Sequence, residues 1–232
     1  MKIQGYQDFV KVLTESGFSM GGGNNEGVFS IISWNWNEAP PYDTPVRWHT
    51  EDKETDPWEW RIRVLEERED ISYAKLFFKK SGYIIKEWYP FFLAARQDGK
   101  SFEEAYFDGT ISHTAKRIYE LFSKNKVLPL HEIKTQGGFS KEEKSAFDRA
   151  LTELQMKMYL TMCGSRQKVS QKGEEYGWSS TVFCTPENFF GKDVLKEASK
   201  ITKKEAVRQI EEQIYHLNPE AEPKKIVKFI TG

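Results

Sequence analysis

The feature that most constrains the fold is the hydrophobic pattern between residues 112 and 185. Apolar residues recur at three- and four-residue intervals from 112 to 125, which predicts an amphipathic helix. A second, shorter helix is expected from 131 to 135. The stretch Ser140-Lys141-Glu142-Glu143 matches a capping box, so a third helix is expected from there to about Met156.

Two strand-like segments follow the third helix. Residues 158–162 and 179–184 have strand character, and the polar stretch 164–177 between them is expected to be the tip of a hairpin. Residues 127–130 are expected only to connect the first two helices. Three helices followed by a hairpin is the order of a winged helix, in which the third helix and the hairpin face DNA when the fold binds it. The sequence therefore predicts an α+β protein with a winged-helix module over 112–185.

The first 111 residues predict an aromatic-rich region of mixed helices and strands. The run Gly21-Gly22-Gly23 lacks the Gly-Lys-Ser/Thr ending of a phosphate-binding loop, so a turn is expected there. The expected elements are a helix over 6–16, a strand over 28–36 and a helix that begins at Asp56-Pro57. Short strands or turns are expected over 71–78 and 82–85, around Lys79-Lys80-Ser81-Gly82. A helix over 88–95 and a short helix from a capping box at Ser101 to about Gly109 follow.

The segment 186–232 predicts a helical extension. The stretch Thr202-Lys203-Lys204-Glu205 is a third capping box, and its helix is expected to end at Asn218-Pro219. A last short helix is expected over 224–230. These two helices are expected to form a hairpin that is appended to the rest of the chain.

The charges are unevenly spread along a chain whose net charge is only −1. Residues 1–111 carry a net charge of −6, residues 112–184 carry +4 and residues 185–232 carry +1. A basic segment in an otherwise neutral protein is compatible with a polyanionic partner, and a simple solvated surface is the alternative interpretation.

Composition also indicates where the protein works. No apolar run approaches the ~18 residues that a membrane-spanning helix needs, and the first residues lack an apolar signal core. We therefore expect a cytoplasmic protein without membrane contact. Cys163 and Cys184 are expected on neighbouring strands, where they could approach each other, and two buried free thiols are favoured over a disulfide. The histidines are scattered and the cysteines lack metal-ligand spacing, so no metal and no cofactor are expected.

The candidate DNA contacts are the basic residues of the expected third helix and hairpin tip. Cations at these places would neutralise phosphates and make binding dependent on salt. Acidic residues such as Glu142, Asp148 and Glu153 share the helix and weaken this interpretation. The candidates are Lys141, Lys144, Arg149, Arg166, Lys168 and Lys172.

The candidate catalytic and ligand-binding residues lie mainly in the stretch Glu54 to Arg61. Asp56 and Glu59 are the candidate catalytic carboxylates, because cleavage of an N-glycosidic bond needs a group that stabilises a cationic sugar or activates water. Trp58, Trp60 and Trp88 are the candidate walls of a pocket for a base or another flat ligand. The structural alternative is that Asp56 caps a helix, Trp58 is core and Glu59 complements the helix dipole.

Four strings of this sequence resemble a bacterial protein family called AlkZ-related. They are Thr55-Asp56-Pro57-Trp58-Glu59-Trp60, Lys86-Glu87-Trp88-Tyr89-Pro90, Leu151-Thr152-Glu153-Leu154-Gln155-Met156 and Lys172-Gly173-Glu174-Glu175-Tyr176-Gly177-Trp178. The resemblance extends over nearly the whole chain. It implies a distant relation to AlkZ, a DNA glycosylase that unhooks interstrand crosslinks and builds its DNA channel from tandem winged-helix units.

The catalytic motif of AlkZ has no counterpart in the expected place. That motif is Gln-apolar-Gln or Gln-apolar-Asp near the N-terminus, and residues 1–60 contain neither. The stretch Gln155-Met156-Lys157 is a near match, but it lies at the end of the third expected helix and ends in lysine. The resemblance therefore carries no catalytic residue over to this chain.

Three functions remain open at this point. The first is a protein that associates with double-stranded DNA and is related to crosslink-repair glycosylases, with excision of alkylated bases as its potential activity. The second is a non-enzymatic winged-helix regulator or protein-interaction module. The third is an enzyme that uses the acidic first half of the chain on a small substrate that is not a nucleic acid.

Overall fold

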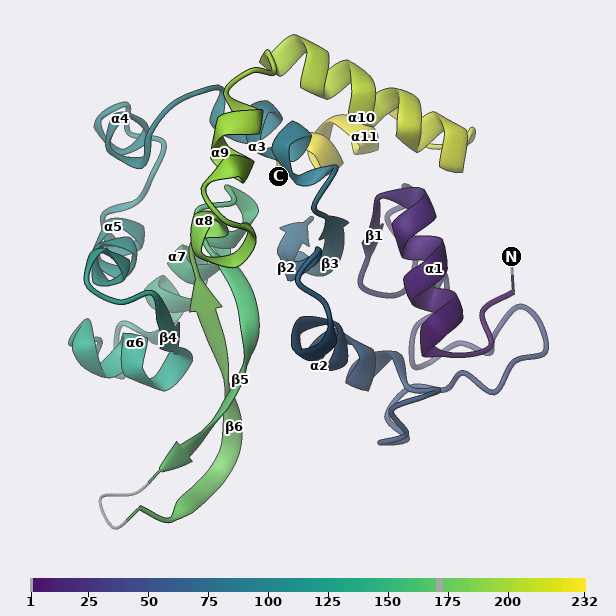
Figure 1. The fold of residues 1–232 in the computed structure, drawn as a ribbon, viewed down its shortest axis with the longest axis horizontal. Coiled ribbons are helices and arrows are strands. Elements are labelled where there is room, and N and C mark those ends of the chain that lie inside the picture. The colour runs from purple at the N-terminus through teal and green to yellow at the C-terminus, as the bar shows by residue number, and fades with distance from the viewer. Residues whose placement is uncertain (1, 170–172) are drawn as a thin grey trace.

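The computed structural model describes residues 2–169 and 173–232 as a mixed α+β protein (Figure 1). Its strands form one open sheet in the order β1-β3-β2-β5-β6-β4, and neighbouring strands are antiparallel. The strands are β1 (Phe18–Met20), β2 (Ile71–Phe77), β3 (Lys80–Ile85), β4 (Val127–Pro129), β5 (Thr161–Val169) and β6 (Glu175–Cys184).

Helices surround this sheet and also form a layer of their own beside the β5–β6 hairpin. The helices are α1 (Tyr6–Ser16), α2 (Pro57–Glu67), α3 (Tyr89–Gln97), α4 (Phe102–Phe107), α5 (His113–Tyr119), the 3-10 helix η1 (Glu120–Ser123), α6 (Leu130–Gln136), α7 (Lys144–Met156), α8 (Pro186–Phe190), α9 (Asp193–Ala198), α10 (Lys203–Leu217) and α11 (Pro223–Thr231).

The sheet consists of two halves that meet between β2 and β5. The described pairing at this junction is the single pair Tyr73 with Met162, whereas β2 and β3 pair at six positions. Figure 1 shows β1, β2 and β3 near α1 and α2, and the long β5–β6 hairpin near α4 to α7. Because the junction is so short, the end of β2 is left open to contacts from helix α7.

The first half of the sheet lies between two apolar layers. Trp60 of α2 and Tyr83 of β3 belong to the layer on one face, which also includes the buried side of α1. Phe77, Phe92 and Phe229 belong to the layer on the other face, which joins β2 to α3 and α11. Strand β2 is buried along nearly its whole length, as expected for a strand that is covered on both faces.

The second half has a core of its own, built from α4 to α7 and the β4–β6–β5 strands. Phe147, Leu151 and Leu154 form the inner side of α7 and are 1%, 7% and 0% exposed. The pattern of three helices and a hairpin after residue 111 is confirmed at the level of these elements.

Several predicted elements differ from the structure. Residues 28–36 form no strand, because their carbonyls accept scattered bonds from the end of β1 and from the loop after it: Met20 N–H donates to the Phe29 carbonyl and Gly23 N–H to the Ile32 carbonyl. Residues 127–129, expected to be a connection, form strand β4 paired with β6. Strands β5 and β6 also extend further into the stretch that was expected to be the tip.

The third helix begins later than its capping box predicts. Ser140 N–H donates to the Glu143 carboxylate, but Arg117 Nη1 donates to the same carboxylate at 2.6 Å, and the helix begins at Lys144. At the two other capping boxes, the helix begins directly after the predicted capping residue. Ser101 and Glu104 form the full reciprocal pair of bonds at α4, and Thr202 accepts from Glu205 N–H at α10.

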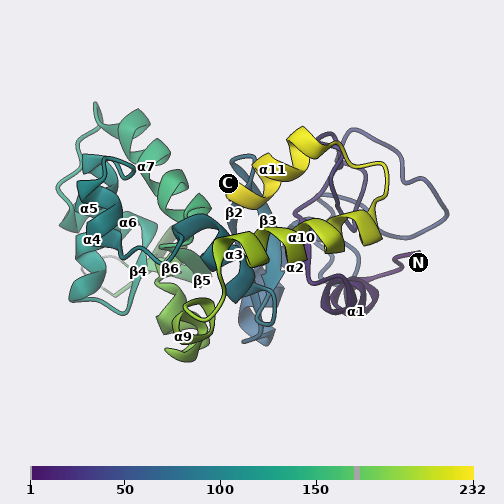
Figure 2. The same cartoon turned by 90° about the horizontal axis from the view of Figure 1, so that it is seen from above.

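The C-terminal helices are part of the main core rather than an appendage to it. Phe229 of α11 stacks on Phe77 of β2 with 3.8 Å between ring centroids and 5° between the ring planes. Ile210 and Ile214 of α10 are fully buried in the same cluster. Figure 2 shows α10 and α11 beside α3. In the parts of the chain that the structure describes, no helix has both the length and the apolar character needed to cross a membrane.

We expect Phe229→Ala to lower the free energy of unfolding by about 3–5 kcal/mol, because it removes a buried ring from the core. Val227→Ala is the matched control, since Val227 lies on the same helix with 56% of its surface exposed; its effect should stay within about 0.5 kcal/mol. Chemical denaturation measures both. A Phe229→Ala protein as stable as the control would contradict an integral role for α11.

Candidate nucleic-acid interface

A basic groove runs along the exposed side of α7. It has a volume of about 870 Å³ and lies between α7, the β2–β3 turn and the end of α11. Lys141, Lys144 and Arg149, predicted from the sequence as DNA contacts, all line it. The structure adds basic side chains from other elements; the full basic set is Lys75, Lys79, Lys141, Lys144, Arg149 and Lys157.

The cations of this groove are free of carboxylate partners within the described residues. None of the six takes part in an ion pair, and five of them are exposed, with Lys157 half-buried. Other cations of the protein are paired, for example Lys80 with Glu26 at 2.8 Å. The groove therefore presents positive charge that the protein itself does not neutralise.

Acidic residues in and just before α7 weakened the sequence-based interpretation. Most of them accept hydrogen bonds from other residues of the protein. Glu153 accepts hydrogen bonds from Ser112 N–H at 2.9 Å and Ser112 Oγ at 2.7 Å. Glu143 accepts from Ser140 N–H and from Arg117, and these two bonds lower the pKa of Glu143. A hydrogen bond from Ser140 lowers the pKa of Glu142. Asp148 lines the groove without such a partner. The groove thus has six basic and three acidic lining residues, with Glu143 outside it.

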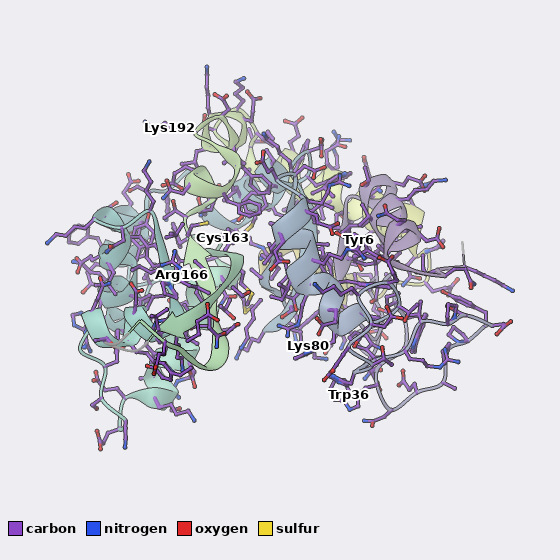
Figure 3. The ribbon with its side chains drawn as sticks, turned by 60° about the horizontal axis from the view of Figure 1, so that its bottom comes forward. Tyr6, Trp36, Lys80, Cys163, Arg166 and Lys192 are labelled. Atoms are coloured by element: carbon purple, nitrogen blue, oxygen red, sulfur yellow. The ribbon has the colours of Figure 1, made fainter. Side chains whose placement is uncertain are left out.

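The hairpin cations are placed less favourably for binding. Arg166 on β5 lies 3.9 Å from Glu132 of α6, and Lys168 lies near the end of β5. Lys172 lies outside the described residues. Figure 3 shows Arg166 and Cys163 on the same hairpin. Neither Arg166 nor Lys168 lines the groove along α7.

Sequence reasoning missed the contribution of the β2–β3 turn. Lys75 and Lys79 reach the groove from a part of the chain that is about 70 residues away from α7 in the sequence. Phe78 and Lys79 in this turn have positive φ angles of 51° and 62°. The Lys79-Lys80 pair predicted a turn, but nothing in the sequence indicated which helix the turn would face.

Asp56 has a structural role at the start of α2. Its Oδ1 accepts from Trp58 N–H at 2.8 Å, and its Oδ2 accepts from Thr50 N–H at 2.8 Å and Glu51 N–H at 3.0 Å. The carboxylate is fully buried. It therefore caps α2 and also fixes the loop before it, in which His49 and Glu51 have left-handed φ angles of 60° and 63°.

A second hollow, the aromatic pocket, lies beside this loop. It has a volume of about 510 Å³, and tryptophans form much of its wall. Of the predicted pocket residues, Trp58 lines it and is 44% exposed, so the alternative that Trp58 is core is wrong. Sequence reasoning missed its partners Trp36 and Trp48, which come from the loop that follows β1.

The other two predicted pocket tryptophans lie elsewhere. Trp60 is fully buried and stacks on Phe9 with 5.1 Å between ring centroids. Trp88 packs against the corner between α1 and β1, where a Cβ on Gly17 would lie 2.3 Å from the indole. Glu59 is half-buried on the first turn of α2 and is not among the residues that line the aromatic pocket. Of the residues predicted to form the catalytic and ligand-binding site, Trp58 alone is among the described lining of the aromatic pocket.

The glutamine of the near-match string Gln155-Met156-Lys157 joins the two halves of the sheet. Gln155 Oε1 accepts from Lys75 N–H at 3.0 Å, and its Nε2 donates to the Leu151 carbonyl at 2.9 Å. The side chain is 1% exposed. The amide of Gln155 provides an acceptor for the Lys75 N–H of β2, beyond the point where β2 pairs with β5. The role of Gln155 is therefore structural.

The two cysteines lie on the neighbouring strands β5 and β6, as expected from the sequence, but only Cys184 is buried as predicted. Both are free, with Cys184 buried and Cys163 half-buried. A hydrogen bond with Cys163, together with burial, raises the pKa of Cys184, so its thiol stays protonated at neutral pH.

The family match covers almost the entire chain. A family described as AlkZ related matches residues 3–231, so the chain belongs to this family. No curated protein matches the chain. No solved structure matches it either.

We expect Asp56→Ala to lower the free energy of unfolding by about 2–4 kcal/mol, because it leaves three backbone N–H groups without their acceptor. Glu59→Gln, one turn along the same helix, is the control and should change stability by less than about 0.5 kcal/mol. Thermal and chemical denaturation measure both. Wild-type stability of Asp56→Ala would contradict the structural role and reopen a catalytic one.

Proposed function

We propose that this AlkZ-related protein binds double-stranded DNA along the basic groove beside α7. The observation that carries this proposal is the set of six basic groove residues, none of which has a carboxylate partner within the described residues. Basic side chains of this kind neutralise DNA phosphates and release counterions, which supplies most of the affinity of sequence-independent binding. DNA association also agrees with the family to which the chain belongs.

The arrangement of residues 112–185 supports the same function. Helix α5, strand β4, helices α6 and α7 and the β5–β6 hairpin follow one another in winged-helix order, and β6 pairs with both β4 and β5. We infer a winged-helix module over 112–185, between an N-terminal region over 1–111 and a C-terminal helical segment over 186–232 whose last helices pack into the core of the N-terminal region. Helix α7 is then the third helix of the module, the one that faces DNA when this fold binds it.

Excision of an alkylated base requires more than binding. A glycosylase needs a group that activates water or stabilises the developing sugar cation beside the bound base. The Asp56 carboxylate is committed to three backbone N–H groups, and the lining of the aromatic pocket contains no acidic side chain among the described residues. These observations favour a second candidate function, a non-enzymatic DNA-binding regulator, over base excision.

The salt dependence of binding tests the groove directly. We expect the slope of log affinity against log salt concentration to become shallower by about 1 for Lys144→Gln, because one phosphate contact is lost, with a further change of about 1 for Arg149→Gln. Lys192→Gln is the matched control, since Lys192 precedes α9, on the side of the molecule away from α7 in Figure 2. Fluorescence anisotropy with a labelled duplex measures the slopes. If the slope became equally shallow in the control and in the groove variants, binding along α7 would be contradicted.

We expect no abasic sites above background when the protein is incubated with alkylated duplex DNA, because no acidic side chain lines the aromatic pocket in the described part of the chain. Cleavage of the treated DNA at abasic sites, followed by gel electrophoresis, measures the product. Product that disappears in Glu59→Gln, while duplex affinity is unchanged, would contradict the non-enzymatic role and support glycosylase chemistry.

A further inference from the structure

The aromatic pocket has the chemistry of a nucleotide-binding site. We propose that it holds one unstacked nucleotide, with the base against the exposed indoles of Trp36 and Trp58 and the phosphate at Arg61. The proposal rests on the proposed DNA-binding function and names what the neighbouring pocket accepts. The pocket is separate from the basic groove and has its own set of lining residues.

The wall of the pocket exposes an unusual amount of aromatic surface. Trp36 is 65% exposed and Trp58 is 44% exposed. The His49 ring lies among the three indoles, with centroids 6.2 Å from Trp36, 6.4 Å from Trp48 and 5.1 Å from Trp58. Exposed aromatic clusters mark binding sites, and every base has a π-face that can stack on an indole. The wall therefore fits a flat aromatic ligand without demanding one particular base.

The wall is held in place before any ligand arrives. A Cβ on Gly22 would lie 2.3 Å from the Trp48 ring, so the glycine permits this indole to pack directly on the backbone. Trp48 Nε1 donates to the Trp34 carbonyl at 3.3 Å. The buried Asp56 carboxylate fixes the adjoining loop at Thr50 and Glu51. A preorganised wall loses less conformational entropy on binding.

Arg61 supplies a cation that suits a phosphate. Its guanidinium lies 3.8 Å from the centroid of the Trp58 ring, and its Nε donates to the Trp58 carbonyl at 2.8 Å. No described carboxylate pairs with it, whereas Lys80 at the same pocket is paired with Glu26. Figure 3 shows Lys80 and Trp36 at the same edge of the molecule. Because the Nε of Arg61 is bonded to the Trp58 carbonyl, the guanidinium keeps its two outer nitrogens available for parallel bonds to phosphate oxygens.

The pocket lies next to the basic groove, which connects it to DNA. Lys79 lines the groove and Lys80, the next residue of the β2–β3 turn, lines the pocket. On β2, Lys75 lines the groove and Tyr73, two residues earlier on the same face of the strand, lines the pocket. A strand held by the groove cations therefore lies close enough to place an unpaired nucleotide against Trp36 and Trp58.

Titrations with four ligands test the proposal. The ligands are a mononucleotide, single-stranded oligothymidine, a duplex with one unpaired base and the fully paired duplex, and fluorescence anisotropy or quenching of tryptophan fluorescence reports binding. We expect Trp36→Ala to weaken binding of the single strand and of the duplex with the unpaired base by about tenfold, because one stacking surface is lost. Binding of the fully paired duplex should stay within about twofold.

Matched variants separate the pocket from the groove and from misfolding. Phe107→Ala is the control for an exposed aromatic outside the pocket, since Phe107 is 82% exposed, and it should leave all four affinities unchanged. Arg61→Gln should weaken binding of the single strand and of the mononucleotide. Lys144→Gln should instead have its largest effect on binding of the paired duplex. Thermal melting confirms that each variant is folded.

The outcomes distinguish the two proposals. Loss of paired-duplex binding in Lys144→Gln with no effect of Trp36→Ala on any ligand supports the groove and overturns the pocket proposal. Single-strand binding that depends on Trp36, with no binding of the paired duplex, supports the pocket and overturns the proposed duplex-binding function. Binding of the mononucleotide alone, dependent on both Trp36 and Arg61, supports a nucleotide site whose ligand is free rather than part of DNA.

Discussion

The guanidinium of Arg96 is the contact on which the arrangement of the two halves depends. It lies on α3 and donates to the carbonyls of Met156 at 2.7 Å, Phe229 at 2.9 Å and Ile230 at 2.9 Å. These carbonyls are at the C-terminal ends of α7 and α11, where helix dipoles place partial negative charge. Burial lowers the pKa of Arg96, yet the group remains charged at neutral pH, and the three carbonyls take the place of a carboxylate partner.

This contact sets the position of the basic groove. Helix α7 carries the groove residues Lys144 and Arg149, and its last turn is fixed to the first half of the protein by Arg96 and by the bond from Lys75 N–H to Gln155. Among the residues that the structure describes, strand pairing at the same junction is limited to Tyr73 with Met162. The side-chain bonds, more than strand pairing, therefore determine the distance between α7 and the β2–β3 turn. This distance sets the width of the basic groove that a phosphate backbone would meet.

Sequence reasoning succeeded where the signal is local and failed where it depends on distant contacts. Helix periodicity located α1, α2, α7 and α10 because each buries one stripe of apolar residues, and capping chemistry placed the starts of α4 and α10. Residues 28–36 were predicted as a strand from their apolar content, but their backbone partners lie at the end of β1 and in the loop after it. The same limit applies to the two hollows. Lys79 lies far in the sequence from Lys144, with which it lines the groove, and Trp36 lies far from Trp58, with which it lines the aromatic pocket.

The commitment of Asp56 decides between two interpretations of the tryptophan-rich string around it. A carboxylate that accepts three backbone N–H bonds while fully buried has few lone pairs left for water or a sugar cation. Moving it to act on a ligand would release both the start of α2 and the loop that holds His49 between the indoles. The residue that most resembles a catalytic acid is therefore the one that keeps the aromatic wall in place. Asp56 therefore serves the shape of the aromatic pocket, which Pro57 and Trp58 line, and any bond-breaking chemistry there would need a group supplied from outside the described lining.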